Sequence, residues 1–348
     1  WGNWGGLNDA TRNQEFTTGS KPNDYTFGGS LGTQHINTRA SFHRAGTRIS
    51  FSGANTNYNG RVMATHASGM NKNGWAYTLS TSYRLANEAH FEGTDYDALS
   101  FFASIEKRIN DNHSINFTGI YAQNSRGKNS PNTEEVNDIA GVRYNSYWGW
   151  QDGKKRNSRD KDLEEPIFIL SHYWKINDNN RLNTNVAYQF GKIGNSRLDF
   201  FKADNPDPTY YRNLPSYFTT FHDGSGVHLP DYTAAENAKF LNNRQINWDA
   251  MYYANTHNTL DPGRSVYVLY EDRTDDKLFS ANTIFSSNLS DNITFNASAN
   301  YRKLRSENFQ ELLDLLGGNY FLDIDPFFLG SEQQPDLNNP NRQVREGD

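Results

Sequence analysis

Apolar and polar residues alternate along the stretch from Pro166 to Phe190, which has the pattern of two strands around a turn. Both halves carry apolar or aromatic side chains at every second position, and the second half places mostly Asn, Arg and Gln between them. Asn177 to Asn180 separates the halves, and Asn and Asp favour tight turns. Period-two alternation on both sides of a polar turn predicts a β-hairpin with one apolar and one polar face.

The same pattern recurs at residues 99–121 and 279–301, and in a weaker form around Asn71 to Gly74. Each strand has roughly the 9–11 residues that cross a bilayer as a tilted strand. Tyr or Trp near the strand ends is typical of an interfacial aromatic girdle. We therefore predict about nine strands, near residues 46–56, 60–69, 74–87, 96–108, 113–124, 166–176, 181–192, 266–289 and 293–304.

The connections between these strands differ in length. Short Asn/Asp turns follow the second, fourth, sixth and eighth strands, whereas long loops are predicted at about 125–165, 193–265 and 305–348. Loops of that length are uncommon in compact soluble domains, but outer-membrane barrels combine short periplasmic turns with long extracellular loops. The pattern predicts an all-β fold, a transmembrane antiparallel β-barrel, with residues 42–348 as its N-terminal part.

Composition narrows the class of protein. Lys and Arg number 34 against 40 Asp and Glu, and a net charge of −6 argues against a nucleic-acid partner. Mean hydropathy is −0.87 although aromatic residues make up 14% of the chain, a combination that suits a barrel with alternating faces. Composition alone leaves a soluble β-sandwich or β-solenoid open. The absence of cysteine excludes disulfides and thiolate metal sites.

Residues 1–41 differ from the rest, because they are rich in glycine and lack the apolar alternation that begins at Thr47. Glycine weakens regular strand pairing. We predict that this segment runs through the lumen of the barrel rather than forming a barrel strand. Arg12 and Arg39 should then find carboxylate or carbonyl partners on barrel or plug, because buried polar groups must be satisfied.

Seven segments carry a resemblance to a known family: WGGLNDATRN (Trp4 to Asn13), YTFGGSLGTQHINTRAS (Tyr25 to Ser41), MNKNGWA (Met70 to Ala76), GKKRNSR (Gly153 to Arg159), YYRNLPSY (Tyr210 to Tyr217), LLGGNY (Leu315 to Tyr320) and LNNPNR (Leu337 to Arg342). Over nearly its whole length the chain resembles TonB-dependent outer-membrane transporters (receptors) of the Bacteroidetes type. The resemblance implies a plug inside a barrel of about 22 strands. Residues 1–41 would be the end of the plug domain and its passage to the barrel, and the next nine strands the first part of the barrel. An upstream plug, a TonB box and a closing strand are not found, so we expect a partial chain.

The family implies active import of a nutrient ligand (a glycan, peptide, siderophore or similar) across the bacterial outer membrane. It also implies the TonB-ExbB-ExbD energy complex as a partner, a surface lipoprotein as a possible one, and contact with lipid and lipopolysaccharide. The alternative is a structural or interaction component of an outer-membrane multiprotein assembly built on a transporter-like barrel. A soluble carbohydrate-binding β-protein is a third possibility.

No H-E-x-x-H zinc motif occurs, and we expect no enzyme, metal site or cofactor. Aromatic loop residues are the best ligand candidates because rings stack on sugars and planar ligands, although packing within a folded loop is the alternative. The candidates are Trp148, Trp150, Tyr210, Tyr211, Arg212, Trp248 and Tyr252. A basic cluster, Lys154, Lys155, Arg156 and Arg159, could attract lipopolysaccharide phosphates or an anionic ligand, or simply be solvated.

The alternation also predicts orientation and facing. The four short turns should lie at one end, facing the periplasm, and the loops 125–165 and 193–265 at the other. The residues expected to face lipid are Phe101, Ile105, Phe117, Val186, Tyr188, Phe285 and Phe295. The residues expected to face the lumen are Asn183, Asn185, Gln189, Asn282, Asn296 and Arg302.

Overall fold

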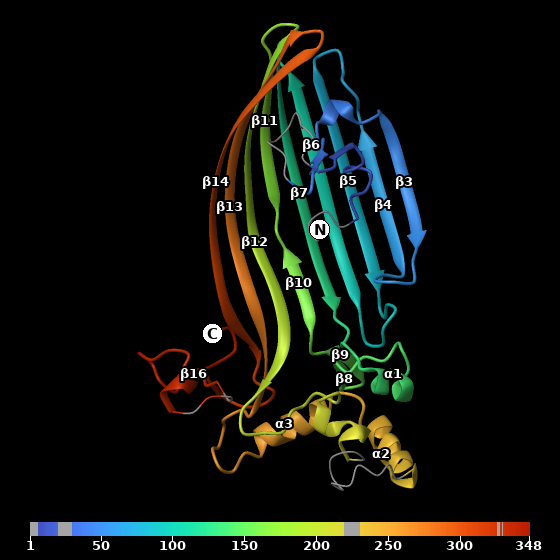
Figure 1. Ribbon diagram of the computed structural model, residues 1–348, viewed down its shortest axis with the longest axis vertical. Coiled ribbons are helices and arrows are strands. Elements are labelled where there is room, and N and C mark those ends of the chain that lie inside the picture. Colours follow the sequence, from blue (N-terminus) through green and yellow to red (C-terminus); the bar gives the residue numbers. More distant parts are fainter. Residues whose placement is uncertain (1–5, 20–29, 219–229, 326–327, 329) are drawn as a thin grey trace.

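The dominant element is a curved, ten-stranded antiparallel sheet (Figure 1). The structure, a computed structural model, describes residues 6–19, 30–218, 230–325, 328 and 330–348. The strands of the sheet are β3 (Gly46–Gly53), β4 (Gly60–Ala67), β5 (Trp75–Ala86), β6 (Tyr96–Arg108), β7 (His113–Gly127), β10 (Asp160–Glu164), β11 (Ile167–Lys175), β12 (Asn180–Phe200), β13 (Tyr267–Ser290) and β14 (Ile293–Asp314). Neighbours along the chain are neighbours in the sheet, and the edge strands of this wall are β3 and β14. The predicted all-β antiparallel fold is confirmed.

Strands β10 and β11 share one position in the wall, because both pair with β7 on one side and β12 on the other. Pro166 lies between them and has no N–H to continue the ladder. Gly191 lies opposite this break with φ 139°, and a Cβ there would approach the Glu164 carbonyl oxygen to 2.0 Å. The ten strands therefore occupy nine positions, which agrees with the predicted count.

Four hairpins close one end of the wall, β4–β5, β6–β7, β11–β12 and β13–β14, and lie at the top of Figure 1. In three of them one Asn side chain holds the turn. The Oδ1 atoms of Asn71, Asn110 and Asn177 each accept backbone N–H groups from residues two to four positions ahead. The long loops lie at the opposite end, so the predicted grouping of turns and loops is confirmed.

Two strands, β12 and β14, are much longer than the alternation predicts. The predicted strands ended at residues 192 and 304, but β12 continues to Phe200 and β14 to Asp314. Loops 193–265 and 305–348 therefore begin about eight to ten residues later than expected, and β10 lies inside the predicted loop 125–165. Beyond residue 192 polar and apolar residues are mixed on both faces, so the alternation disappears while the backbone ladder continues through pairs such as Asn195 with Asp272.

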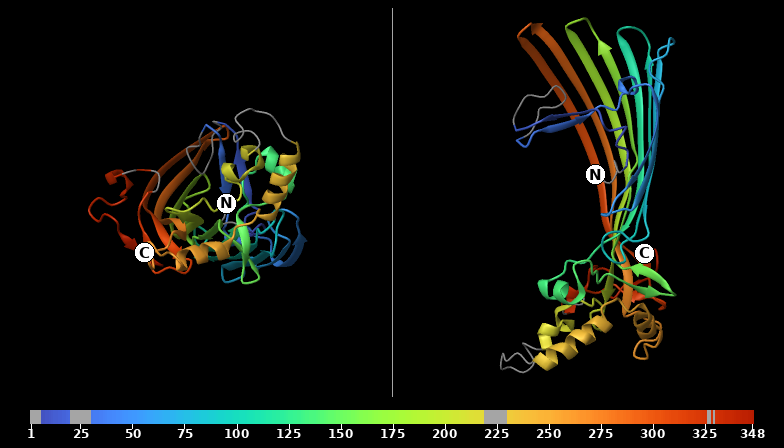
Figure 2. Two further views of the ribbon diagram at one scale, coloured as in Figure 1. Left: turned by 90° about the horizontal axis from the view of Figure 1, so that it is seen from below. Right: turned by 90° about the vertical axis from the view of Figure 1, so that its right-hand side faces the viewer.

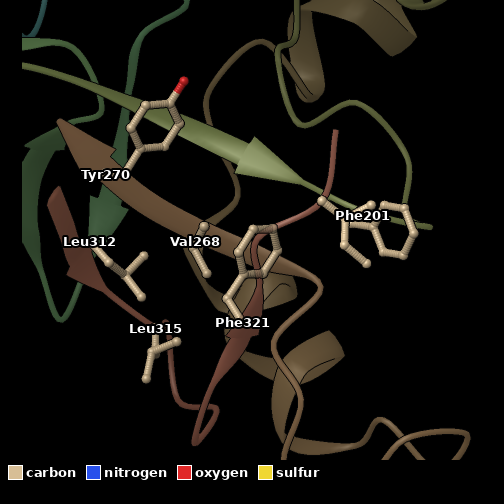
Figure 3. Close-up of a cluster of buried hydrophobic side chains, with 7 residues drawn as sticks. Phe201, Val268, Tyr270, Leu312, Leu315 and Phe321 are labelled. Atoms are coloured by element: carbon tan, nitrogen blue, oxygen red, sulfur yellow. The ribbon is translucent and has the colours of Figure 1, made fainter. Parts of the chain in front are cut away.

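The loops fold into a layer of their own below the wall (Figure 1). It contains α1 (Glu134–Ala140), β8 (Trp148–Gln151), β9 (Lys154–Asn157), η3 (Tyr211–Asn213), α2 (Pro230–Asn242), α3 (Trp248–Thr256), β15 (Phe321–Leu322), η5 (Gly330–Gln333) and β16 (Gln343–Val344). One of its small cores joins Phe201, Val268 and Tyr270 to Leu312, Leu315 and Phe321 (Figure 3). Among the described residues, no helix has both the length and the apolar character needed to span a membrane.

Candidate functional site

The two faces of the wall have opposite chemistry. Residues paired across neighbouring antiparallel strands point to the same face. One lateral row of paired residues is apolar: Ile105, Phe117, Leu170, Val186 and Ala281. The adjacent row, on the other face, is polar: Glu106, Asn116, Ser171, Asn185 and Asn282. All seven residues predicted for the apolar face share the first face, and all six predicted for the polar face share the second.

Burial is inverted relative to a water-soluble sheet. On the apolar face Phe101 is 47%, Leu170 51% and Phe295 50% exposed. On the polar face Ser104 and Glu106 are 0% and Asn116 is 1% exposed. The polar face is covered in part by the N-terminal segment, whereas nothing in the described chain covers the apolar one.

The N-terminal segment lies on the concave, polar side of the wall (Figure 2). Its short strands β1 (Gln14–Thr17) and β2 (Thr33–Ile36) pair with each other in a separate sheet and not with the wall. Leu7 and Ala10 pack against Phe102 and Ile120 of β6 and β7. The described parts of the segment, 6–19 and 30–41, are thus not wall strands, as predicted; residues 1–5 and 20–29 lie outside the described residues.

Arg39 anchors this segment to the wall, just before the short helix η2 (Ala40–Phe42). Its Nε and Nη2 atoms donate to Glu106 Oε1 at 2.8 and 2.6 Å, and Nη2 also donates to Ser114 Oγ at 3.1 Å. The other oxygen of Glu106 accepts the backbone N–H of Ser41 at 3.0 Å. The guanidinium also lies 4.2 Å from the centre of the Tyr173 ring. The carboxylate expected for Arg39 is therefore Glu106 of β6, and its side chain is fully buried.

The contacts of Arg12 are weaker than those of Arg39. Its Nη2 atom lies 3.6 Å from Asp9 Oδ1 in the same segment, and Arg48 of β3 reaches the same oxygen at 3.4 Å. The Arg12 side chain is 56% exposed. An exposed ion pair of this kind contributes little to stability, so Arg39, and not Arg12, holds the segment in place.

At the loop end, the concave face carries a group of cations that the sequence reasoning missed. We name it the cationic row: Arg126, Lys128, Arg159, Lys161 and Arg197. Arg126 and Lys161 are directly paired across β7 and β10, and Lys161 is in turn paired with Asn195 of β12. Lys128 Nζ donates to Asn195 Oδ1 at 2.6 Å, and its backbone N–H donates to the Arg159 carbonyl at 2.7 Å.

The neighbouring cations of the row act on Lys128. Burial, followed by the charges of Lys161, Arg159 and Arg126, lowers the pKa of its ammonium group, while Asp272 opposes the shift. Arg197 Nε lies 3.4 Å from Asp272 Oδ2, so this acid is already engaged. If the strands had been predicted to continue about ten residues beyond the apolar band, alternation would have placed these cations on one face. The sequence does not show that the strands continue, because apolar and polar residues stop alternating there.

No family model and no curated protein matches this chain. Similar solved structures include the ferric-catecholate import receptor Fiu of Escherichia coli in a closed form (12% identity, 95% of this chain and 40% of that chain, TM-score 0.47). Its open form is also similar (10% identity, 88% and 42%, TM-score 0.49), as is the siderophore receptor PiuA of Acinetobacter baumannii (11% identity, 86% and 52%, TM-score 0.42). The chain spans about half or less of each. Because every TM-score is below 0.5, function has to be inferred from the residues of this chain.

Two of the predicted ligand residues are buried and are corrected here. Trp148 is 5% and Trp248 0% exposed. Trp248 packs with Ile246, Met251, Leu269 and Leu316. Gly93 lies so close to the Trp148 ring that a Cβ at this glycine would be only 2.0 Å from it. Both rings are enclosed by their own loops, so they stabilise the loop layer and are unsuited to contacting a ligand.

The remaining candidates form two separate groups. Trp150, 54% exposed, lies beside Trp148, and Tyr252 OH accepts from Gln151 Nε2 at 3.0 Å and donates to Asp314 Oδ2 at 3.3 Å. Tyr210 and Tyr211 contact one another at 4.7 Å between ring centres, with Arg212 over Tyr211. The structure does not bring these two groups into one site.

The basic cluster seen in the sequence is also divided. Lys155 forms an ion pair with Glu88, and Arg156 pairs with Asp314 at 2.7 Å. Arg159 belongs to the cationic row, where its guanidinium lies 5.1 Å from the centre of the Tyr147 ring. Only Lys154 of the four is exposed without an ion pair in the described structure, so the cluster is not a single anion-binding surface.

Proposed function

We propose that this chain forms part of the barrel wall and the end of the plug of a bacterial outer-membrane transporter that imports a nutrient ligand with energy delivered through TonB. The observation that carries the proposal is the inverted polarity of the wall. A continuous apolar surface of this size is rare on soluble monomers. In a bilayer it is required, since polar groups on the lipid face of a barrel cost about 2–4 kcal/mol for Arg or Lys at the midplane.

The aromatic residues of the apolar face support the same placement. Trp75 and Trp174 lie near the hairpin end of the wall, with Lys107 Nζ 4.9 Å from the centre of the Trp75 ring. Tyr83 and Tyr121 lie toward the loop end, where Tyr121 OH donates to Glu164 Oε1 at 2.9 Å. Two aromatic bands that flank an apolar zone are typical of barrel–membrane interfaces. By the same rule the hairpin end faces the periplasm and the loop layer faces outward.

The anchored N-terminal segment supports a plug rather than an open pore. The Arg39–Glu106 pair lies on the concave face at the hairpin end, where a segment that fills the lumen would contact the wall. A cavity of about 440 Å³ remains beside it, lined by polar residues that include Asn183, Asn185 and Asn282. A plug that packs only partly against a polar wall can be displaced by an applied force, because few contacts have to be broken. Contacts with a surface lipoprotein and lipopolysaccharide remain part of the proposal.

Energy-dependent uptake tests this function. A deletion strain and the same strain complemented with the complete protein would be supplied with an isotope-labelled nutrient pool, with and without a protonophore. We expect accumulation of at least one compound that depends on both the protein and the proton gradient. Accumulation that is the same with and without the protonophore would indicate a passive channel. Unchanged uptake together with stable envelope complexes would support the assembly component instead.

A further inference from the structure

We propose that the cationic row is a binding site for an oligoanion, a small molecule with at least two carboxylate or phosphate groups. This inference rests on the proposed function, for which it names the chemical class of the ligand. The row contains five cations, Arg126, Lys128, Arg159, Lys161 and Arg197, on three adjacent strand positions of the concave face. Strands lie about 4.8 Å apart, so the charges are spread over roughly 10 Å.

The pairing of Arg126 with Lys161 is the decisive observation. Like charges placed directly opposite one another on one face of a sheet are destabilising. In the described structure neither side chain has a hydrogen-bond or ion-pair partner. A sheet that keeps two uncompensated cations side by side is well suited to a ligand that supplies the missing negative charge.

The acids near the row do not neutralise it. Asp272 is held by Arg197 and also accepts from Gln310 Nε2 at 3.2 Å. Asp95 accepts the backbone N–H of Gly127 at 3.1 Å. Asp160 and Asp162 alternate with Arg159 and Lys161 along the strand and so point to the opposite face. The excess of positive charge therefore lies at Arg126, Lys128 and Lys161, because Asp199, on the same face of β12 as Arg197, adds to the acids at the other end of the row.

Space and neutral donors accompany the charge. One cavity of about 650 Å³ is lined by Tyr96, Arg126 and Lys128. A second, of about 640 Å³, is lined by Arg159 and Arg197 but also by four aspartates, Asp199, Asp323, Asp325 and Asp348, so its charge is mixed. The first cavity, beside the Arg126–Lys161 pair, is therefore the one suited to an anionic ligand. Charge-assisted hydrogen bonds to carboxylate or phosphate are the strong contacts expected here, and Thr94 and Asn129 of the first cavity supply neutral polar groups.

Binding to the purified complete protein in detergent tests the proposal, with trigalacturonate and tripolyphosphate as anionic probes and maltotriose as the neutral control. We expect at least one anionic probe to bind, more weakly as salt rises because ions screen the charges, and maltotriose not to bind. Preference between the two anionic probes distinguishes carboxylate from phosphate ligands. If neither binds, or if maltotriose binds equally well, the proposal is wrong.

Two double variants, one in the cationic row and one outside it, test whether the row is the binding site. Arg126→Ala with Lys161→Ala should weaken binding at least about 100-fold, because two contacts to charged groups are lost and each is worth about tenfold or more. Lys192→Ala with Lys277→Ala removes the same charge from the apolar-face side of β12 and β13 and should change binding less than about twofold. Equal effects of the two pairs would overturn the proposal. Heat-modified gel mobility identifies any variant that fails to fold, and Lys161→Gln alone then replaces the double variant.

The outcome is separable from that of the uptake experiment, because binding in detergent needs neither TonB nor a membrane. Energy-dependent import of a compound without binding of either anionic probe contradicts only the oligoanion site. Probe binding without energy-dependent import keeps the site and contradicts the transporter.

Discussion

The convex and concave faces of the wall are built from the same strands, by residues that alternate along them, yet they behave in opposite ways. Phe101 and Phe117 are left exposed on the convex face, whereas Ser104 and Asn116 are buried on the concave one. A soluble sheet would reverse this pattern because apolar burial from water drives its folding. Under the proposed function, the two faces are stabilised by different partners, lipid on the convex side and the anchored N-terminal segment on the concave side.

Removing the anchor on the concave face should have the largest effect. Arg39→Ala leaves Glu106, whose side chain is fully buried, without its cation, and breaking such a pair costs about 3–5 kcal/mol. We expect residues 38–42 to exchange amide hydrogens much faster, as measured by hydrogen exchange with mass spectrometry. Arg12→Ala, at an exposed pair, should cost less than about 1 kcal/mol. Similar acceleration by both variants would mean that the segment is not held through Arg39.

A charge placed on each face compares the two faces directly. Val186→Arg puts a cation on the convex face and should cost about 2–4 kcal/mol at the bilayer midplane, enough to reduce assembly. Asn185→Arg, the adjacent residue, faces the polar cavity and should be tolerated far better. Heat-modified gel mobility of the membrane fraction measures the assembled share. Equal tolerance of the two substitutions contradicts the assignment of faces.

The assignment of faces is also the part of the structure that was most predictable from sequence. Period-two alternation placed Val186 and Asn185 on opposite faces, and the Asn-rich turns gave the register. The cationic row was not predictable in the same way, because Lys161 and Arg197 lie where polar and apolar residues are mixed on both faces. The burial of Trp148 and Trp248 could not be predicted from the sequence for another reason. The residues that enclose them, such as Gly93 and Leu269, lie far away in the sequence.

The loop layer extends the comparison to a part of the chain that folds as a soluble protein does. Gly93→Ala would place a Cβ 2.0 Å from the Trp148 ring, at φ 64°, and overpacking of this kind costs about 1–3 kcal/mol. Gly153→Ala has a similar φ, 74°, but no atom within 4 Å. Limited proteolysis between β8 and β9 should therefore accelerate more for Gly93→Ala. Matching rates would show that Trp148 is not enclosed.

The smallest expected effect is a pH dependence at Asp160, the first residue of β10, where the wall meets the loop layer. Burial, and then Asp95 and Asp162, raise the pKa of Asp160 to about 7. The unfolded carboxyl group has a pKa of about 3.9, so the folded state binds more protons between these values. Stability around this junction should rise as pH falls from about 7 toward 4, and Asp160→Asn should remove that contribution. Hydrogen exchange of residues 148–164 at several pH values measures it, and an unchanged pH profile in the variant contradicts the assignment.

The convex face lying in lipid is the central claim, and the absence of cysteine from the chain makes a direct test practical. Single cysteines at each position from Leu182 to Phe190 would carry a nitroxide label, with the complete protein in lipid bilayers. Accessibility to oxygen, which partitions into lipid, and to a water-soluble nickel chelate would be measured by electron paramagnetic resonance. We predict a period of two: high oxygen and low nickel accessibility at Leu182, Val186, Tyr188 and Phe190, and the reverse at Asn183, Asn185 and Gln189. Nickel access without alternation along the strand would show that both faces meet water, and the membrane-wall account would be wrong.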